Sequence, residues 1–282
     1  MSIIANHVEY VYNPGTTFEK KALNDVSFKI DDGEYIGFAG HTGSGKSTLV
    51  MHLNALMKPT SGEIYYNGVD IASEGYDLKA LRGKVGLVFQ YPEHQLFEED
   101  VFSDVCFGPK NLGLSRSEIE LRAYDALKAV GVKDKHFYVS PFDLSGGEKR
   151  RAAIAGVLAM KPEVLILDEP CAGLDPKGRE EILALVDDLH ESLGITIIIV
   201  SHSMDDLAEH AQRILVMNEG SLVLDGSSRE VFTHREELEE MGLAVPEAAA
   251  VLSDLRKMGF NTRDGLITND EAVSEILRVL GR

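Results

Sequence analysis

The pattern of apolar and polar residues along the chain predicts a layered α/β fold. Residues 26–30 alternate apolar and polar side chains, which predicts a strand with one buried face. Later runs are almost continuously apolar and strand-sized, at 35–39, 85–89, 164–167 and 196–200. Such runs are typical of strands buried on both faces, and helical patterns separate them. The sequence therefore predicts a mostly parallel sheet covered by helices.

Other segments predict antiparallel strands. We expect residues 1–35 to form antiparallel strands with a turn at 13–15. Residues 63–66 and 69–71 flank Asn67-Gly68, a strong hairpin signal. A second hairpin is expected at 213–223. These elements predict an antiparallel β subdomain beside the parallel core.

Residues 91–160 are expected to form a helical subdomain inserted between strands of the core. Ser115 and Glu118 have the spacing of a capping box, and an amphipathic helix pattern follows at 123–130. Further helices are predicted at about 148–160 and 178–192. We therefore assign residues 1–234 to one large domain that contains this insertion.

Residues 235–282 are predicted to form a small helical C-terminal extension. One helical face carries Ala248, Val251, Leu255 and Met258. The Thr268-x-x-Glu271 pattern predicts a capped last helix with an apolar face formed by Val273, Ile276, Leu277 and Leu280. Because so short a segment has too little apolar surface for a core of its own, we expect it to pack on the main domain or on a partner.

Charge and composition narrow the function. The 28 Lys and Arg side chains against 46 Asp and Glu give a formal net charge of −18. This balance argues against general nucleic-acid binding and against adsorption to anionic lipid. No apolar run has the length of a membrane span, no signal peptide is recognised, and the two cysteines form no metal-binding pattern. We expect a cytoplasmic protein that reaches a membrane only through another protein.

A phosphate-binding loop is the strongest motif. Residues 40–47 match G-x-x-x-x-G-K-[ST], between a predicted strand and a predicted helix. Backbone amides and the helix N-terminus of such a loop bind phosphate, Lys46 neutralises the β- and γ-phosphates, and the Ser47 hydroxyl completes a Mg²⁺ shell. The predicted ATP-binding residues of this segment are Gly40, His41, Thr42, Gly43, Ser44, Gly45, Lys46, Ser47 and Thr48.

Polar residues at the ends of the predicted parallel strands complete this site, since ligands of such sheets bind at that edge. Asp168 is expected to hold Mg²⁺, and Glu169 to polarise the water that attacks the γ-phosphate. Gln90 is placed to reach the metal and the water. His202 either bonds to the γ-phosphate or is a surface histidine. Tyr12 either stacks on the base or is a packing residue.

A second glycine turn precedes a helix at Leu144-Ser145-Gly146-Gly147-Glu148. It is another expected phosphate nest. Two nests in one chain are explained if the phosphate loop of one subunit faces the glycine turn of another in a head-to-tail dimer.

Taken in order, these motifs together with Ala172-Gly173-Leu174-Asp175 resemble those of the ATP-binding-cassette (ABC) ATPases over about residues 3–232. The resemblance implies that two subunits sandwich two ATP molecules. Ser145, Gly146 and Gly147 would then reach the partner's γ-phosphate, and Asp175 would communicate across the dimer. It also implies that Tyr12 stacks on the base, and that Gln90 and the segment after it contact a transmembrane partner.

A narrower resemblance is to the ATPases of energy-coupling-factor transporters, and among their two paralogues to the second. It is carried by residues 12–16, 18–20, 86–97, 107–113 and 143–147, and by short motifs of the C-terminal extension. It implies uptake of vitamins or of cobalt and nickel ions, powered at the cytoplasmic face of the membrane. The implied partners are a second ATPase subunit, a transmembrane coupling subunit and a small substrate-binding membrane protein. Glu148 and Cys171 depart from the family pattern, where glutamine and threonine are common.

Two other functions compete with transport. A cassette ATPase acting on nucleic acid or ribosomes would need a coiled-coil insertion or two cassettes, and this chain has one cassette and no heptad array. A small-molecule kinase would leave residues 144–148 unexplained. For the acidic segment after Gln90, with Glu93, Glu98, Glu99 and Asp100, we expect either a groove that receives a basic helix of the coupling subunit or a solvated loop.

Overall fold

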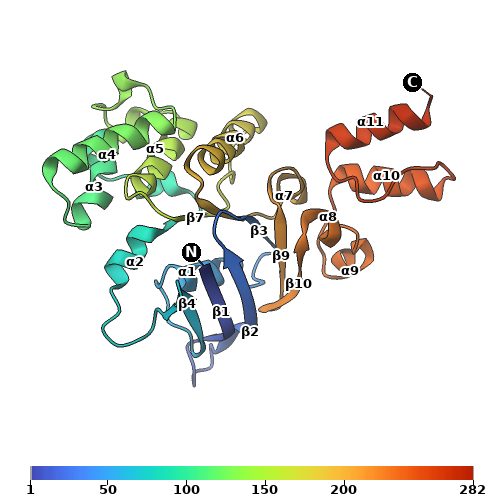
Figure 1. Cartoon of the computed structure of the whole chain (residues 1–282), viewed down its shortest axis with the longest axis horizontal. Helices are drawn as coiled ribbons and strands as arrows, with labels where there is room; N and C mark the ends of the chain where they lie inside the picture. The colour runs from blue at the N-terminus through green and yellow to red at the C-terminus, as the bar shows by residue number, and fades with distance from the viewer. Residues whose placement is uncertain (1, 282) are drawn as a thin grey trace.

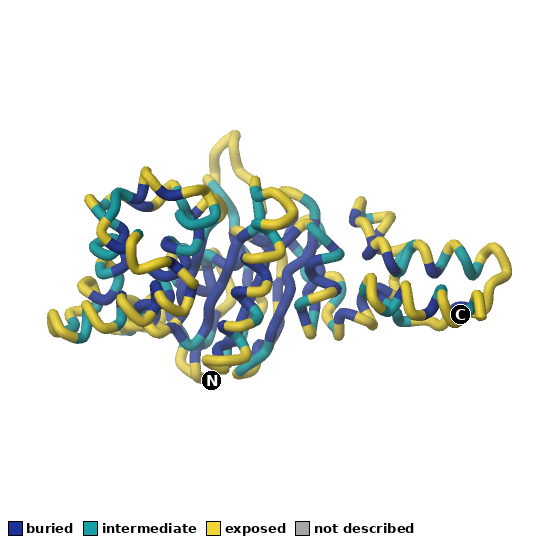
Figure 2. The backbone as a smooth tube through the Cα atoms, turned by 90° about the horizontal axis from the view of Figure 1, so that it is seen from above, coloured by how far each residue is buried: buried dark blue, intermediate teal, exposed yellow. Residues whose placement is uncertain are grey.

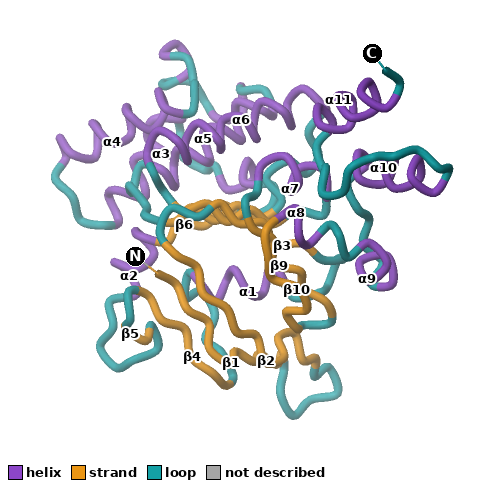
Figure 3. Tube along the Cα trace, turned by 45° about the vertical axis from the view of Figure 1, so that its right-hand side comes forward, coloured by secondary structure: helices purple, strands orange, loops and turns teal. Residues whose placement is uncertain are grey.

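The computed structural model describes residues 2–281 and contains two β-sheets, with helices on both sides of the larger one (Figures 1 and 3). The larger sheet has the strand order β10-β9-β3-β8-β7-β6, and all its pairings are parallel except that of β9 with β10. Its strands are β3 (Tyr35–Ala39), β6 (Val85–Val88), β7 (Val164–Asp168), β8 (Thr196–Val200), β9 (Arg213–Asn218) and β10 (Ser221–Ser227). The predicted α/β class and mostly parallel core are confirmed.

The central strands are apolar throughout because each of their faces packs on a different layer. Ile36 and Phe38 of β3 face α1 (Lys46–Leu53) and the smaller sheet, whereas Tyr35 and Ala39 face the other helices. Figure 2 shows these strands as a continuous buried centre. The chain thus presents the carboxyl ends of β3, β6, β7 and β8 at one edge of a rigid sheet.

The smaller sheet is antiparallel, as predicted, with the strand order β2-β1-β4-β5. Asn67 and Gly68 join β4 and β5 with φ angles of 52° and 76°, which is the conformation that a two-residue hairpin turn requires. The strands are β1 (Ser2–Tyr12), β2 (Lys20–Asp31), β4 (Ser61–Tyr66) and β5 (Val69–Asp70).

The segment between β6 and β7 is helical, as predicted for residues 91–160. It follows α2 (Leu78–Lys84) and consists of η1 (Pro92–Gln95), α3 (Val101–Asn111), α4 (Arg116–Ala129), η2 (Asp134–His136), η3 (Pro141–Asp143) and α5 (Gly146–Leu158). The capping box predicted at Ser115 is only half formed. Ser115 accepts a hydrogen bond from the Glu118 amide, but the Glu118 carboxylate bonds to Arg122 at 2.6 Å instead of returning to the cap.

The remaining helices follow β7, β8 and β10. Helix α6 (Pro176–Leu193) starts two residues before the predicted position, and α7 (Met204–His210) follows β8. The C-terminal part comprises α8 (Ser228–Val231), α9 (Arg235–Glu240), α10 (Glu247–Lys257) and α11 (Asn269–Val279). Figure 1 shows α10 and α11 at the far end of the molecule from the helical segment of α3 to α5.

The extension has a small core, and its predicted apolar faces are largely exposed. Ala248, Leu252 and Ala272 form the buried cluster between α10 and α11. Of the predicted face of α10, Val251 and Met258 are exposed in this single chain, because the helix rests on the row of Ala248 and Leu252. In α11 the predicted face is exposed at Val273, Leu277 and Leu280, and only Ile276 packs on the cluster.

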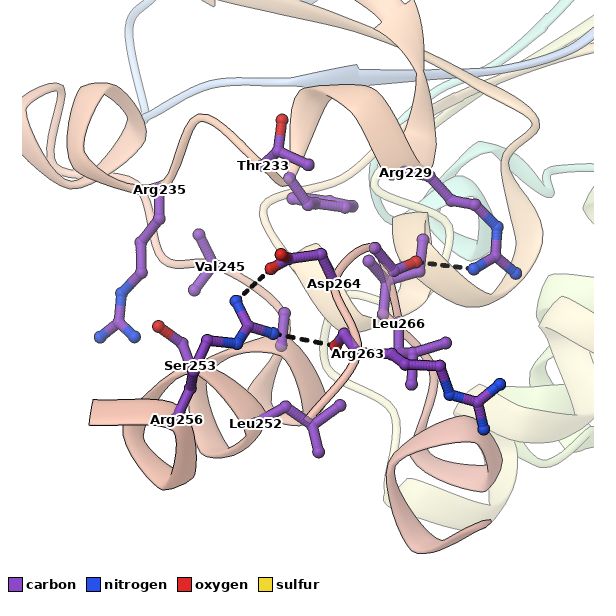
Figure 4. A pocket seen from close by; sticks show the side chains of 14 residues that line it. Arg229, Thr233, Arg235, Val245, Leu252, Ser253, Arg256, Arg263, Asp264 and Leu266 are labelled. Atoms are coloured by element: carbon purple, nitrogen blue, oxygen red, sulfur yellow. Dashed lines mark hydrogen bonds and ion pairs between the residues drawn. The ribbon is translucent and has the colours of Figure 1, made fainter. Parts of the chain in front are cut away.

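Ion pairs attach the extension to α8. The Arg229 guanidinium bonds to the carbonyl of Gly265 at 2.7 Å and to the carboxylate of Glu271. Arg256 bonds to Asp264 and to the carbonyl of Arg263, which closes the loop between α10 and α11 (Figure 4). Electrostatic contacts therefore supplement the small apolar core of this region.

Candidate functional site

The phosphate loop lies between β3 and α1, at the carboxyl edge of the parallel sheet, and two of its glycines are required by its own geometry. Gly40 has a φ of 149°, and an added Cβ would lie 2.4 Å from the carbonyl oxygen of Met217. Gly45 has a φ of 107°, and its Cβ would lie 2.6 Å from the carbonyl oxygen of Ala22. Only glycine fits both positions, so the sequence of this loop folds into one shape.

Lys46 is buried inside that loop, with 7% of its surface exposed. Its ammonium donates hydrogen bonds to the carbonyl oxygens of Gly40 at 2.5 Å and His41 at 3.1 Å. Burial lowers the pKa of Lys46, and the nearby carboxylates of Glu169 and Asp168 oppose that shift. A cation held mainly by neutral carbonyls in a buried loop gains from an incoming anion.

The other loop residues tie the turn to the β9–β10 hairpin. His41 Nε2 lies 3.2 Å from the Asn218 side-chain oxygen, and the Gly220 amide donates to the carbonyl of buried Ser44 at 3.0 Å. Half-buried His41 and buried Ser44 therefore connect the loop to this hairpin.

Asp168 ends β7 and is buried, with 6% of its surface exposed. Burial raises its pKa, while the Ser47 hydroxyl and Lys46 oppose the rise. Its Oδ1 atom has no hydrogen-bond partner among residues 2–281. A buried carboxylate oxygen without a partner fits a site that receives a further donor or a cation.

Glu169 follows in an unusual backbone conformation, with a φ of 51°. Its amide still donates to the Val200 carbonyl at 3.0 Å, so the strand ends there and the side chain is redirected. Its Oε2 lies 2.8 Å from Nδ1 of His202, which follows β8. Burial raises the pKa of the Glu169 carboxyl, and His202 is the strongest opposing influence. The two adjacent carboxylates thus have different surroundings, as expected at a strand end.

One cavity of about 390 Å³ joins most of the predicted ATP-site residues. Its lining consists of Tyr12, Lys20, Ala22, Thr42, Gly43, Gly45, Lys46, Ser47, Thr48, Gln90, Glu169 and His202. Lys20 and Ala22, on the strand beside Tyr12, were not predicted. Gly40, His41, Ser44 and Asp168 do not line the cavity.

Tyr12 stands at the end of an aromatic column. Its ring meets Tyr10 edge-on at 4.8 Å between centroids, and Tyr10 meets buried His52 of α1 at 4.6 Å. The Tyr12 hydroxyl lies 3.1 Å from the hydroxyl of Thr48. Packing on Tyr10 therefore fixes the Tyr12 ring at the rim of the cavity.

The second glycine turn does not line this cavity. Ser145 caps α5, and Gly146 and Gly147 start that helix. An added Cβ at either glycine meets nothing within 4 Å, and neither has a positive φ. Asp175 is likewise outside the cavity, where its carboxylate caps α6 by accepting from the Gly178 amide at 2.8 Å. Nothing in the described part of the chain requires glycine at 146 or 147.

Sequence reasoning missed Arg150, which connects three of these segments. It is 1% exposed and pairs with both oxygens of Glu93, at 2.7 and 3.1 Å. Its other nitrogen donates to the carbonyls of Pro170 and Ala172, just after Glu169, at 2.8 and 2.9 Å. The sequence did contain a signal, an arginine at a position of α5 where the apolar pattern predicts a buried residue. A buried guanidinium needs hydrogen-bond partners such as these carboxylate and carbonyl oxygens.

Comparisons with known proteins show the family of this chain. A family model described as ABC transporter matches residues 23–172. The energy-coupling factor transporter ATP-binding protein EcfA2 of Caldanaerobacter subterraneus is 51% identical over 280 residues, which cover 99% of this chain and 98% of the relative. EcfA2 of Clostridium perfringens is 53% identical over 285 residues, with 99% of each chain covered.

Solved structures give the same result. CbiO1 of Clostridium perfringens, described as part of the ABC transporter complex cbiONQ, has a TM-score of 0.75 and 38% identity, covering 91% of this chain and 96% of its own. The dimeric bacterial ABC transporter cassette MJ0796 has a TM-score of 0.71 and 30% identity, covering 80% of this chain and 98% of its own.

Within residues 2–281, no helix has the length and apolar character needed to cross a bilayer. The predicted family, fold and enzyme class are confirmed. The chain therefore belongs to the ABC transporter family of ATPases, which hydrolyse ATP to drive transport, and within it to the ATP-binding proteins of energy-coupling factor transporters.

Proposed function

We propose that this ATPase powers the uptake of vitamins or of cobalt and nickel ions through a membrane coupling subunit, together with a second cassette and a small substrate-binding membrane protein. It would act at the cytoplasmic face of the membrane. The observation that carries this proposal is the division of the ATP machinery: one cavity holds the groups for hydrolysis, while Ser145, Gly146 and Gly147 lie outside it. This division supports a function that requires a second cassette.

In this proposal the phosphate loop binds ATP and Mg²⁺. Lys46 faces the β- and γ-phosphates, and loop amides with Thr48 hold the remaining phosphate oxygens. The Ser47 hydroxyl, the unpartnered oxygen of Asp168 and Gln90 would hold Mg²⁺. Bound Mg²⁺ neutralises developing charge on the phosphates and usually needs few protein ligands. The arrangement fits this need, since Ser47 and Gln90 both line the cavity and the Ser47 hydroxyl is bonded to the Asp168 carboxylate.

Glu169 would be the general base. Its raised pKa makes it a better proton acceptor than an exposed carboxylate, and its hydrogen bond to His202 holds its orientation. His202 is largely exposed, so it can turn its second nitrogen toward the γ-phosphate. Gln90 lines the same cavity and would orient the attacking water.

A second cassette, either a paralogue or another copy, would complete the site from Ser145, Gly146 and Gly147, with Asp175 beside it. The freedom around the two glycines supports this, since their lack of side chains matters only if another group approaches closely. The exposed apolar residues Val273, Leu277 and Leu280 support an extension that also associates with the partner.

The coupling subunit would dock in a groove of about 720 Å³ between α2, α3 and α5. Phe97 and Phe107 line it, are 60% and 41% exposed, and meet edge-on at 5.0 Å. None of the four carboxylates of the expected acidic groove lines this one, and Glu98 and Glu99 stay candidates for contact with a basic helix at its rim. Glu93 is paired with Arg150 and Asp100 caps α3, so neither is available to a basic helix. The exposed rings of Phe97 and Phe107 favour a helix with an apolar face.

Co-purification from solubilised membranes tests this function. The full chain should retain an integral membrane protein, and the double variant Phe97→Ser with Phe107→Ser should lose it while still binding ATP. Phe142→Ser, at an exposed phenylalanine outside the groove, is the matched control. Recovery of ribosomes or nucleic acid without a membrane protein would favour the alternative function and contradict transport.

A further inference from the structure

The hydroxyl of Ser145 is held by a single side chain, that of Glu148. The Ser145 oxygen accepts from the Glu148 amide at 3.4 Å, and its proton is donated to Oε2 of Glu148 at 2.7 Å. The same Oε2 also accepts from the Ser145 amide at 3.1 Å. These bonds form a complete capping box at the start of α5.

This arrangement has a chemical consequence for phosphate binding. A serine hydroxyl has one proton to donate, and an ionised carboxylate can only accept. Ser145 must therefore withdraw its proton from Glu148 before it can donate to a phosphate oxygen. The carboxylate released in this way would lie beside another anion, which disfavours the contact.

Two basic side chains, those of His136 and Lys133, lie near Glu148. The hydrogen bond from the Ser145 hydroxyl is the largest cause that lowers the Glu148 pKa, and His136 and Lys133 lower it further through their charges. Nδ1 of His136 lies 3.0 Å from Oε1, the carboxylate oxygen that does not face Ser145. His136 is thus positioned to weaken the hold of Glu148 on the serine proton.

We infer that Glu148 is a positioning residue that restrains the Ser145 hydroxyl, and that His136 relieves this restraint, so that the pair sets how readily two cassettes close on ATP. This inference rests on the proposed function, in which Ser145 contacts the nucleotide of the partner. The pair thereby regulates closure without touching ATP in its own subunit.

The substitution Glu148→Gln isolates the charge. A glutamine keeps an oxygen for the Ser145 amide and hydroxyl and turns its amide nitrogen toward His136, so the cap is retained. The quantity to measure is the ATP concentration that gives half-maximal dimerisation in ultracentrifugation. The full-length protein carries Glu169→Gln, and its dimer partner is the cassette with which the parent chain dimerises, either a second copy or a paralogue. Glu148→Gln should lower this concentration about tenfold, the effect of replacing a charged acceptor by a neutral one.

His136→Asn should raise the same concentration about threefold in the parent and leave it unchanged in the Glu148→Gln protein, because the charge that His136 moderates is then absent. A purely structural role of His136 would give the same effect in both backgrounds. Glu118→Gln is the matched control, since Glu118 has the same place at the start of α4 but bonds to Arg122.

The outcomes separate this inference from the proposed function. If Ser145→Ala weakens dimerisation and Glu148→Gln does not strengthen it, the inference is wrong and the dimer model stands. If Ser145→Ala has no effect, the assigned role of Ser145 fails, and the inference fails with it. Thermal unfolding of each variant identifies any loss of the α5 cap.

Discussion

The two glycine turns that begin α1 and α5 look alike in sequence and differ in what requires their glycines. At Gly40 and Gly45 a side chain would collide with backbone of the same chain. At Gly146 and Gly147 a side chain would meet only open space. The first turn is therefore complete within one chain, with Lys46 buried in it, whereas open space surrounds the glycines of the second. A glycine without an internal reason indicates a surface that another molecule approaches closely.

The largest expected effect comes from Glu169→Gln, which should allow the two turns to meet but prevent the reaction. Because an amide cannot accept a proton, steady-state ATP hydrolysis should fall by about 10² to 10⁴, the usual contribution of a general base. ATP binding should persist and an ATP-bound dimer should accumulate. Turnover of radiolabelled ATP and sedimentation measure the two effects, with Glu180→Gln, at an exposed position of α6, as the control. Turnover close to that of the parent would refute the role of Glu169.

Lys46→Ala should weaken ATP binding at the first turn without changing the second turn. The phosphates lose their buried cationic partner, so affinity for ATP should fall roughly a hundredfold, as expected for loss of charge-assisted hydrogen bonds. Titration with a fluorescent ATP analogue measures this change. Lys177→Ala, at a lysine that is 83% exposed on α6, should bind like the parent. Unchanged affinity in a folded Lys46→Ala protein would place the ATP site elsewhere.

The second turn is tested by Gly147→Ala, with Gly45→Ala in the first turn as the separate variant for comparison. Alanine at 147 should leave the melting temperature unchanged or slightly raised, because the position is helical and unobstructed. ATP-driven dimerisation should nevertheless weaken on the order of 30-fold, through lost hydrogen bonds to a charged phosphate. Alanine at 45 should lower the melting temperature itself. If Gly147→Ala dimerises normally, the proposed close approach of the partner is incorrect.

How far the sequence predicted this molecule depends on whether a feature is local. Strand runs, the phosphate loop and the strand-end position of Glu169 follow from spacing, and they were found. The capping pattern S-x-x-E occurs at both Ser115 and Ser145, yet only the second forms the reciprocal box. The difference is the residue four positions after the glutamate, Arg122 in one helix and Ala152 in the other, because only arginine competes for the carboxylate.

Features set by packing between distant segments were not predictable in this way. The pairing of Arg150 with Glu93 joins residues 57 positions apart, and no spacing rule identifies the partner. In α10, apolar residues occupy two adjacent rows, and burial of Ala248 with Leu252 rather than Val251 depends on where α11 lies. The sequence indicates that such a helix has apolar side chains to bury, while the tertiary structure determines which row of them is buried.

Tyr12→Leu has the smallest expected effect and tests whether the site formed by the first turn also binds the nucleotide base. The Tyr12 ring is held by Tyr10 and faces a cavity shared with the phosphate loop. Base stacking on an aromatic ring contributes about 1–3 kcal/mol, so affinity for ATP should fall by about tenfold. Affinity for tripolyphosphate, which has no base, should not change.

Two variants are controls for this prediction. Tyr12→Phe keeps the ring but removes the hydroxyl that meets Thr48, and Tyr65→Leu alters another tyrosine of the same sheet, so both should bind ATP nearly as the parent does. Calorimetric titration of both ligands gives the ratio of their affinities. An equal loss for ATP and tripolyphosphate would mean that Tyr12 supports the fold of the phosphate loop through Thr48 instead of contacting the base.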